Sequence, residues 1–285
     1  MKVVIMPNLT RENAYEVTVR LCEELKSLDI SYSFLPETNS VEELPEGKII
    51  TPEDLKDNAD VLIAIGGDGT MMRAAMTVLH DEIPVLGINA GNLAYLMGLE
   101  SDEMHLLKKL ITGDYLIEER IVLQVDVFND SNKLTFTDYS INEVVFARGA
   151  EIKLNRFDLF CDDRFINRYN SDGLIVATPT GSTAYNLAAG GPVVDPRIEC
   201  IIFSPICPHS LVERSVIFSA DSCFRVERAE DTLQSFVSCD GRGSVGFGPG
   251  SKAIIKKADK KARFIRIKDD TFMEILHQKM KNNNR

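Results

Sequence analysis

A turn rich in glycine is the first segment of the chain that could do chemistry. Gly66-Gly67-Asp68-Gly69-Thr70 follows an apolar run that ends at Ile65, and a helix is expected to begin near Met71. Glycines let the backbone approach a ligand closely, and successive N–H groups beside a helix N-terminus form a cradle for phosphates. Phosphates would repel Asp68 unless it binds a metal or accepts a proton from a hydroxyl that attacks phosphorus. The alternative is a tight strand-to-helix turn with Asp68 as its N-cap.

The place of this turn favours a functional role, because open α/β sheets bind ligands at the carboxyl ends of their parallel strands. The sequence lacks GxxxxGK[ST], so it is not a P-loop kinase. A second stretch, Gly241-Arg242-Gly243-Ser244-Val245-Gly246, matches GxGxxG. No helix is expected after it and its surroundings are β-rich, so we interpret it as a glycine-rich hairpin.

The elements that must position the turn are a series of alternating strands and helices. Predicted strands cover residues 3–5, 31–35, 61–65 and 84–88, and predicted helices cover about 12–28 and 102–112. This alternation predicts a parallel, doubly wound sheet over the first 115 residues.

After Tyr115 the pattern changes to short β-rich segments separated by turn residues, which predicts a β-sandwich or layered-sheet domain. The segments are 121–128, 134–146, 152–161, 164–169, 199–203, 215–218, 224–227, 236–239, 252–256 and 264–267. Residues 271–280 are expected to form a closing amphipathic helix.

Length and charge limit the class of protein. The chain has 285 residues, which indicates two domains or one large one. Its formal net charge of −11 argues against a general binder of nucleic acid or of anionic membranes. Small anionic ligands stay compatible with that charge, because local fields hold them.

Cysteine usage and hydropathy point to a reducing compartment, and we expect the cytoplasm. The six cysteines include no CxxC pair, and no histidine lies at zinc-ligand spacing, so we interpret them as buried, inert thiols. The N-terminus lacks the apolar stretch of a signal peptide. The longest uncharged run, residues 173–194, contains prolines and glycines and is not expected to be a membrane helix.

Four ordered blocks resemble those of the NAD kinases, which phosphorylate NAD to NADP. The blocks are GGDGT at 66–70, GINAGNLAYL at 87–96, NEVV at 142–145 and DGLIVATPTGSTAYN at 172–186. GGDGT alone is shared with diacylglycerol and sphingosine kinases, whereas the last block is highly specific. The resemblance extends from the first strand to about residue 270.

The resemblance implies site residues in both halves of the chain. Asp68 resembles the general base that accepts the proton of the 2′-hydroxyl of the adenosine ribose. Positions that match NAD contacts of the family are Asp68, Gly69, Arg73, Asn142, Glu143, Lys153, Asn170, Asp172, Thr183, Ala184, Tyr185, Asn186, Leu187 and Ala188. Lys153 and Asn170 fall where family members vary. The phosphate cradle would consist of Gly66, Gly67, Gly69 and Thr70, and no residue is assigned as a metal ligand.

Physical reasons support these assignments, and each has an alternative. Asn142 beside Glu143 could satisfy the donors and acceptors of a ribose diol, or be an ordinary polar pair on a strand. The ring of Tyr185 could form a flat wall for a base, or belong to the core. Arg73, about one helical turn after Gly69, could reach phosphate or lie on the helix surface.

Three departures from the family pattern stand out. Ala94-Tyr95 replaces the usual Gly-Phe, Arg242 replaces a common Gln, and Arg214-Ser215 replaces Arg-Pro. None of them is expected to touch Asp68 or Asn142-Glu143. His209, in a turn that contains Pro208, is expected to be a structural hydrogen-bonding residue.

The resulting prediction is an NAD kinase with a Rossmann-like α/β domain at 1–115 and a β-sandwich domain at 116–268. A helix at about 269–285 is expected to return to the first domain, and NAD to lie in the crevice between the two. The donor would be ATP, with other nucleoside triphosphates or polyphosphate as alternatives, together with Mg²⁺ or another divalent metal. The resemblance also implies a homodimer or homotetramer, and we expect no nucleic-acid or membrane partner. The competing interpretations are a GGDGT lipid kinase and a non-catalytic NAD(P) sensor.

Overall fold

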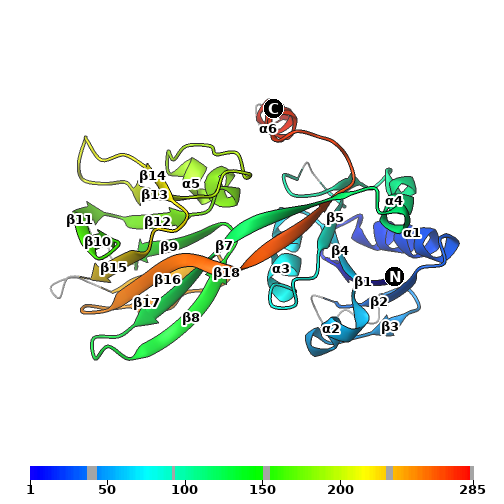
Figure 1. The fold of residues 1–285 in the computed structure, drawn as a ribbon, viewed down its shortest axis with the longest axis horizontal. Coiled ribbons are helices and arrows are strands. Elements are labelled where there is room, and N and C mark those ends of the chain that lie inside the picture. Colours follow the sequence, from blue (N-terminus) through cyan, green and yellow to red (C-terminus); the bar gives the residue numbers. More distant parts are fainter. Residues whose placement is uncertain (37–43, 92–93, 150–154, 229–233, 283–285) are drawn as a thin grey trace. The chain divides into compact units, whose positions relative to one another are not determined.

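The computed structural model describes residues 1–36, 44–91, 94–149, 155–228 and 234–282. The chain divides into two units (Figure 1): unit 1 comprises Met1–Glu119 and Lys261–Arg285, and unit 2 comprises Arg120–Lys260. Each unit is built around a hydrophobic core of its own residues.

Unit 1 is a parallel sheet with helices. The strands are β1 (Lys2–Pro7), β2 (Ser31–Phe34), β3 (Lys48–Ile49), β4 (Val61–Gly66), β5 (Val85–Asn89) and β6 (Leu99–Glu100). They pair in parallel in the order β3-β2-β1-β4-β5-β6. Every residue of β4 is buried, as expected for a parallel strand that is covered on both faces.

The helices of unit 1 follow the strands. They are α1 (Ala14–Ser27), η2 (Pro52–Asp54), α2 (Leu55–Asn58), α3 (Asp68–Thr77), η3 (Met104–Leu107), α4 (Lys108–Thr112) and α6 (Phe272–Asn282), where η marks a 3₁₀ helix. In α1, Val17, Leu21 and Leu25 recur at helical spacing and are buried in the core.

Unit 2 is a β-sandwich. One sheet has six strands in the order β14-β13-β12-β9-β16-β17. These are β9 (Glu143–Arg148), β12 (Gly173–Ala177), β13 (Cys200–Ile206), β14 (Val216–Ser219), β16 (Ser235–Cys239) and β17 (Val245–Phe247). Two short helices follow β12: η4 (Thr180–Thr183) and α5 (Tyr185–Ala188).

The other sheet of unit 2 contains β7 (Leu116–Phe128), β8 (Leu134–Ser140), β10 (Asn155–Cys161), β11 (Arg164–Ser171), β15 (Phe224–Arg228) and β18 (Lys252–Arg266). Phenylalanines from both sheets interlock in the core, for example Phe146 of β9 and Phe157 of β10, whose ring centroids lie 6.2 Å apart. The long strands β7 and β18 each begin in one unit and end in the other.

The predicted fold class is confirmed: an α/β unit comes first and an antiparallel sandwich second. One predicted segment is wrong in detail, because residues 134–146 form two strands, β8 and β9, in different sheets. The chain changes sheets at Ser140–Asn142, which brings Asn142 and Glu143 to the start of β9. The interpretation of the cysteines holds for four of six, since Cys207 is exposed and Cys223 is half-buried.

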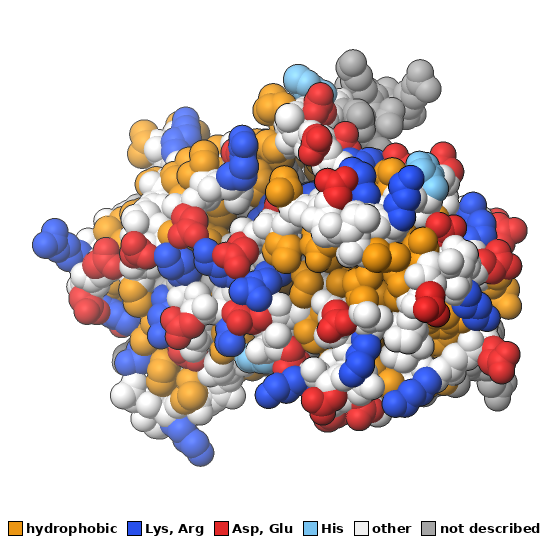
Figure 2. Space-filling view, turned by 45° about the vertical axis from the view of Figure 1, so that its right-hand side comes forward, with side chains coloured by type: hydrophobic (Ala, Val, Ile, Leu, Met, Phe, Trp, Pro, Cys, Tyr) orange, Lys and Arg blue, Asp and Glu red, His pale blue; other side chains and the backbone are white. Residues whose placement is uncertain are grey.

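Surface charge is mixed on the face shown in Figure 2, where lysine and arginine side chains lie among aspartates and glutamates. No helix in the described part of the chain is long and apolar enough to cross a membrane.

Candidate active site

The glycine turn lies at the carboxyl edge of the sheet of unit 1. Neighbouring strands β1, β4 and β5 run in parallel, so the turns after Pro7, Gly66 and Asn89 are adjacent. Backbone hydrogen bonds join these turns: the amide of Asn8 donates to the carbonyl of Ile65, and that of Ala90 to the carbonyl of Gly66, both at 2.9 Å. The predicted cradle therefore stands where open α/β sheets bind ligands.

Asp68 is the first residue of α3, and Gly67 is its N-cap. The Asp68 carboxylate accepts hydrogen bonds from the backbone N–H groups of Tyr95 and Leu96, each at 2.8 Å. The alternative of Asp68 as an N-cap is therefore wrong. The expectation that the Ala94-Tyr95 departure leaves Asp68 untouched is also wrong, although the contact is made by backbone. The two bonds fix the orientation of the carboxylate.

Packing inside the protein requires glycine at one position of the turn but not at the other two. A Cβ at Gly66 would lie 2.3 Å from Oγ1 of Thr70, so packing inside unit 1 demands glycine there. A Cβ at Gly67 or Gly69 would meet only a guanidinium nitrogen, of Arg11 or Arg73 respectively, at 3.7 Å. That is ordinary contact, and neither glycine has a left-handed backbone. Packing inside the protein therefore does not explain these two glycines, and the atoms nearest to both positions are guanidinium nitrogens.

The side chain of Arg73 lies beside Gly69. Its Nη2 donates to Oγ1 of Thr70 at 3.4 Å, and its Nη1 is the atom nearest to a Cβ at Gly69. The side chain thus turns back toward the N-terminus of α3, where its charge can reach a phosphate. This orientation favours phosphate binding over the alternative of an arginine directed along the helix surface.

In unit 2, Asp240 holds the Asn142-Glu143 segment. Its carboxylate accepts hydrogen bonds from the amides of Ile141 (2.9 Å), Asn142 (2.8 Å) and Glu143 (3.1 Å), and from the hydroxyl of Ser140. Four donors on one carboxylate determine the path of the chain where it passes from β8 to β9. Sequence reasoning missed Asp240, because its partners are about a hundred residues away in the sequence.

Glu143 is a buried acid, and one of its carboxyl oxygens has no hydrogen-bond partner among the described residues. Glu143 is 7% exposed, and the unpartnered oxygen in the described part of the chain is Oε2. Burial raises the pKa of Glu143 to about 8, with a further contribution from Asp240, while the amide of Tyr185 acts in the opposite direction. Glu143 is therefore mostly protonated at pH 7 and can donate a hydrogen bond to a ligand.

The segment after β12 packs against Asn142. The amide of Thr178 donates to the carbonyl of Asn142 at 2.8 Å, and a Cβ at Gly181 would lie 2.2 Å from that carbonyl oxygen. This close approach brings Tyr185 to Glu143. Tyr185 is 45% exposed, so the alternative of a core tyrosine is wrong and its ring is available as a wall.

Asn186 differs from its neighbours. It is fully buried, and its amide donates to the carbonyls of Ser182 and Pro192 and accepts from the hydroxyl of Ser204. Its side chain supports the segment from within. Thr183 and Ala184 are half-buried, whereas Leu187 and Ala188 are exposed beside Tyr185.

Two predicted site residues, Asp172 and Asn170, lie at the end of the β9–β12 pair that is opposite to Glu143. Glu143 faces Ala177 in this pairing, whereas Asp172 precedes β12 and forms an ion pair of 3.0 Å with Arg148. Asn170 lies exposed on β11, and its carbonyl accepts the amide of His209 at 2.8 Å. A ligand that contacts both ends must extend along these strands. Lys153 lies outside the described residues.

Arg242 does not join the site in unit 2. It donates to Asp138 at 3.0 Å and to the carbonyl of Tyr139, both on β8. This agrees with the expectation that it leaves Asn142-Glu143 untouched.

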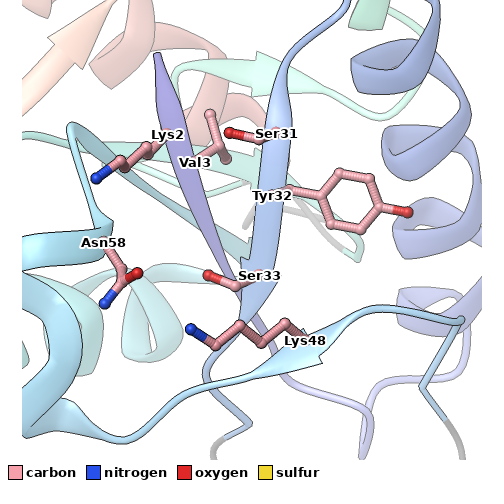
Figure 3. A pocket seen from close by; sticks show the side chains of 7 residues that line it. All are labelled: Lys2, Val3, Ser31, Tyr32, Ser33, Lys48 and Asn58. Atoms are coloured by element: carbon pink, nitrogen blue, oxygen red, sulfur yellow. The ribbon is translucent and has the colours of Figure 1, made fainter.

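A separate polar pocket of about 190 Å³ lies at the opposite, amino-terminal edge of the sheet of unit 1 (Figure 3). It is lined by Lys2, Val3, Ser31, Tyr32, Ser33, Lys48 and Asn58. None of the residues predicted to do chemistry lines it.

Comparisons with known proteins identify the family of the chain. Residues 3–115 match the ATP-NAD kinase N-terminal domain, and residues 141–267 match the ATP-NAD kinase C-terminal domain. The NAD kinase of Caldanaerobacter subterraneus is 34% identical, with 98% of each chain covered. That of Carboxydothermus hydrogenoformans is 38% identical over 82% of this chain and 83% of the relative.

Solved structures share the fold. Yeast NADH kinase complexed with NADH matches with a TM-score of 0.87 at 22% identity, covering 100% of this chain and 89% of the other. An NAD kinase from Archaeoglobus fulgidus in complex with ATP matches with a TM-score of 0.74 at 25% identity, covering 99% of both. The two domain matches and the full-length relatives show that the chain belongs to the NAD kinase family.

Proposed function

We propose that this protein transfers a phosphoryl group from ATP to the 2′-hydroxyl of the adenosine ribose of NAD, giving NADP. It would thus be a phosphotransferase with an alcohol-group acceptor. Family membership supports the reaction, and one observation carries the site: Asp68 is fixed by two backbone amides at the glycine turn.

In this reaction Asp68 accepts the proton of the 2′-hydroxyl as its oxygen attacks the terminal phosphorus of ATP. The new bond joins the ribose oxygen to phosphorus, and the bond to the leaving ADP oxygen breaks. The amides at the start of α3, with Gly67 and Gly69, cradle the phosphates, and Arg73 adds positive charge.

Asn142 and Glu143 hold the ribose in this proposal. A protonated Glu143 donates to a ribose oxygen, and the Asn142 amide offers both a donor and an acceptor. Buried polar groups of this kind reject a ligand that lacks the matching hydroxyl. Tyr185 provides a wall for a base, and the other proposed NAD contacts are Lys153, Asn170, Asp172, Thr183, Ala184, Leu187 and Ala188.

We propose Mg²⁺ or another divalent ion as a companion of the donor. The described residues hold no group of three or more His, Cys, Asp or Glu side chains that could bind a metal. Mg²⁺ fits this chain nonetheless, because it keeps several waters and binds mainly through substrate phosphates. Bound there, it would neutralise charge on the donor.

Other expectations stay predictions: a homodimer or homotetramer, a place in the cytoplasm, and polyphosphate or other nucleoside triphosphates as donors. Each can be measured directly, by light scattering, by localisation of the tagged protein and by donor substitution in the assay.

The decisive test is NADP formation from NAD and ATP with Mg²⁺, followed with an NADP-specific dehydrogenase. Asp68→Asn should lower kcat by about 10²–10⁴ while NAD still binds. Because the Asn amide would face one of the two backbone N–H donors, the melting temperature of the variant must be measured alongside. Near-normal turnover by Asp68→Asn would refute the base assignment.

The same experiment separates the alternatives. Phosphorylation of diacylglycerol in place of NAD would identify a lipid kinase. Tight dinucleotide binding without NADP formation, in the presence of ATP and Mg²⁺ or Mn²⁺, would identify a sensor.

A further inference from the structure

Arg11 reaches over the glycine turn from the loop that follows β1. Its Nη2 lies 3.7 Å from the position of a Cβ at Gly67, and its Nη1 lies 3.9 Å from that of a Cβ at Gly91. Gly67 follows β4 and Gly91 follows β5. The guanidinium group therefore spans the turns that follow three adjacent strands.

Local hydrogen bonds fix the backbone from which Arg11 extends. The Asn8 side chain accepts from the hydroxyl (2.6 Å) and the amide (3.3 Å) of Thr10, and donates to Oγ1 of Thr70 at 3.1 Å. The amide of Arg11 donates to the carbonyl of Asn8 at 3.1 Å. Asn8 thus joins the Arg11 loop to the last residue of the glycine turn.

Among the described residues, the charge of Arg11 has no partner. Its guanidinium is exposed and forms no ion pair or side-chain hydrogen bond with any residue that the structure describes. Asp68, the acid of the turn, directs its carboxylate to Tyr95 and Leu96. In unit 2, by contrast, arginines such as Arg168 and Arg197 form close ion pairs with aspartates.

The turn needs positive charge. Residues 59–107 contain Arg73 and no lysine, so the segment that includes the cradle supplies one permanent cation. A transferring phosphoryl group spreads negative charge over three oxygens, and kinases without a P-loop lysine must neutralise it by other means. A planar guanidinium with five donors suits this task.

We propose that Arg11 binds the terminal phosphate of the donor and stabilises the charge that develops as the phosphoryl group is transferred. This inference rests on the proposed kinase reaction. Arg11 keeps all its protons: the hydroxyl proton passes to Asp68, and the leaving electron pair stays on the ADP oxygen.

The test compares Arg11→Ala and Arg11→Lys with Arg20→Ala in the full-length protein. Arg20 lies exposed on α1, and its removal deletes the same charge without touching the turn. Arg11→Ala should lower kcat/KM for ATP by about 10²–10³, the usual loss for one transition-state donor. Arg11→Lys should lose less, because it keeps the charge without the fork of donors.

Binding readouts separate this proposal from the proposed function. Titration calorimetry with a non-hydrolysable ATP analogue and Mg²⁺, without NAD, should show affinity at least tenfold weaker for Arg11→Ala. NAD affinity and melting temperature should match wild type, and Arg20→Ala should match wild type throughout. If wild type makes no NADP, the proposed function fails. The calorimetry still tests whether Arg11 binds the phosphates of the donor.

Three outcomes would overturn the assignment. The first is analogue affinity of Arg11→Ala within threefold of wild type. The second is a loss of NAD affinity in place of donor affinity, which would move Arg11 to the acceptor. The third is a matching loss in Arg20→Ala, which would indicate a general charge effect.

Discussion

Replacement of Glu143 by glutamine should remove a pH dependence of stability that is built into unit 2. The carboxyl is buried beside Asp240, which raises its pKa to about 8 from an ordinary value of 4.5. Glutamine is nearly isosteric with the protonated acid, and it stays neutral at every pH of interest.

The sign of the effect follows from the two pKa values. Below pH 4.5 the carboxyl is protonated in both the folded and the unfolded state, so it has no pH effect. Between pH 4.5 and 8 the unfolded chain releases the proton while the folded chain retains it, so the free energy of unfolding falls with pH. The slope is about 1.4 kcal/mol for each pH unit. From pH 5 to 8 the free energy of unfolding should fall by at most about 4 kcal/mol. Relaxation of the site, or water that enters it, makes the decrease smaller.

Urea unfolding of wild type and Glu143→Gln at pH 5, 6, 7 and 8 measures the difference. At an m-value of about 2 kcal/mol per molar urea, the midpoint of wild type should fall by up to about 2 M relative to the variant. Glu16→Gln, an exposed change on α1, controls for the loss of a carboxylate. Parallel midpoints for wild type and Glu143→Gln across this range would refute the reasoning.

The remaining predictions concern the glycine turn and Asp240. Gly69→Ala should stabilise the protein by up to about 1 kcal/mol, because alanine favours helix and the new Cβ meets only Arg73. The same change should raise KM for ATP at least tenfold, and an unchanged KM would remove the turn from the donor site. Gly66→Ala should instead lower the melting temperature by several degrees, because its Cβ overlaps Thr70; scanning calorimetry of both variants checks the contrast. Asp240→Asn should cost about 1–3 kcal/mol for each amide that loses its acceptor and should raise KM for NAD more than KM for ATP; equal effects on both would contradict a positioning role.

Local features of unit 1 could be predicted from the sequence. The apolar run that forms β4 and the glycines after it are adjacent, so they indicate a strand, a turn and a helix without further information. The predicted start of α3, near Met71, lies three residues after the observed start at Asp68. A helix that begins at Asp68 requires a partner outside the helix for the carboxylate. That partner is the backbone at Tyr95 and Leu96. Every residue except proline has a backbone amide, so the sequence does not indicate which amides bind Asp68.

The parts of the site that could not be predicted depend on contacts between distant residues. Nothing near Asp240 in the sequence indicates that it binds the amides of Asn142 and Glu143. Alternation of apolar residues over 134–146 indicates strand, but it does not say that the chain changes sheets at Ser140–Asn142. Arg11 was missed for the same reason, since only the parallel pairing of β1 with β4 brings it to Gly67.

The hydrogen bonds that orient Asp68 have a consequence for how this enzyme family can diverge. Because backbone N–H groups hold the carboxylate, its orientation is independent of which side chains occupy positions 94 and 95. A sequence can exchange Gly-Phe for Ala-Tyr there and leave the Asp68 carboxylate in place. The side chains at positions 94 and 95 can thus change, while the main chain preserves the orientation of the Asp68 carboxylate from one family member to the next.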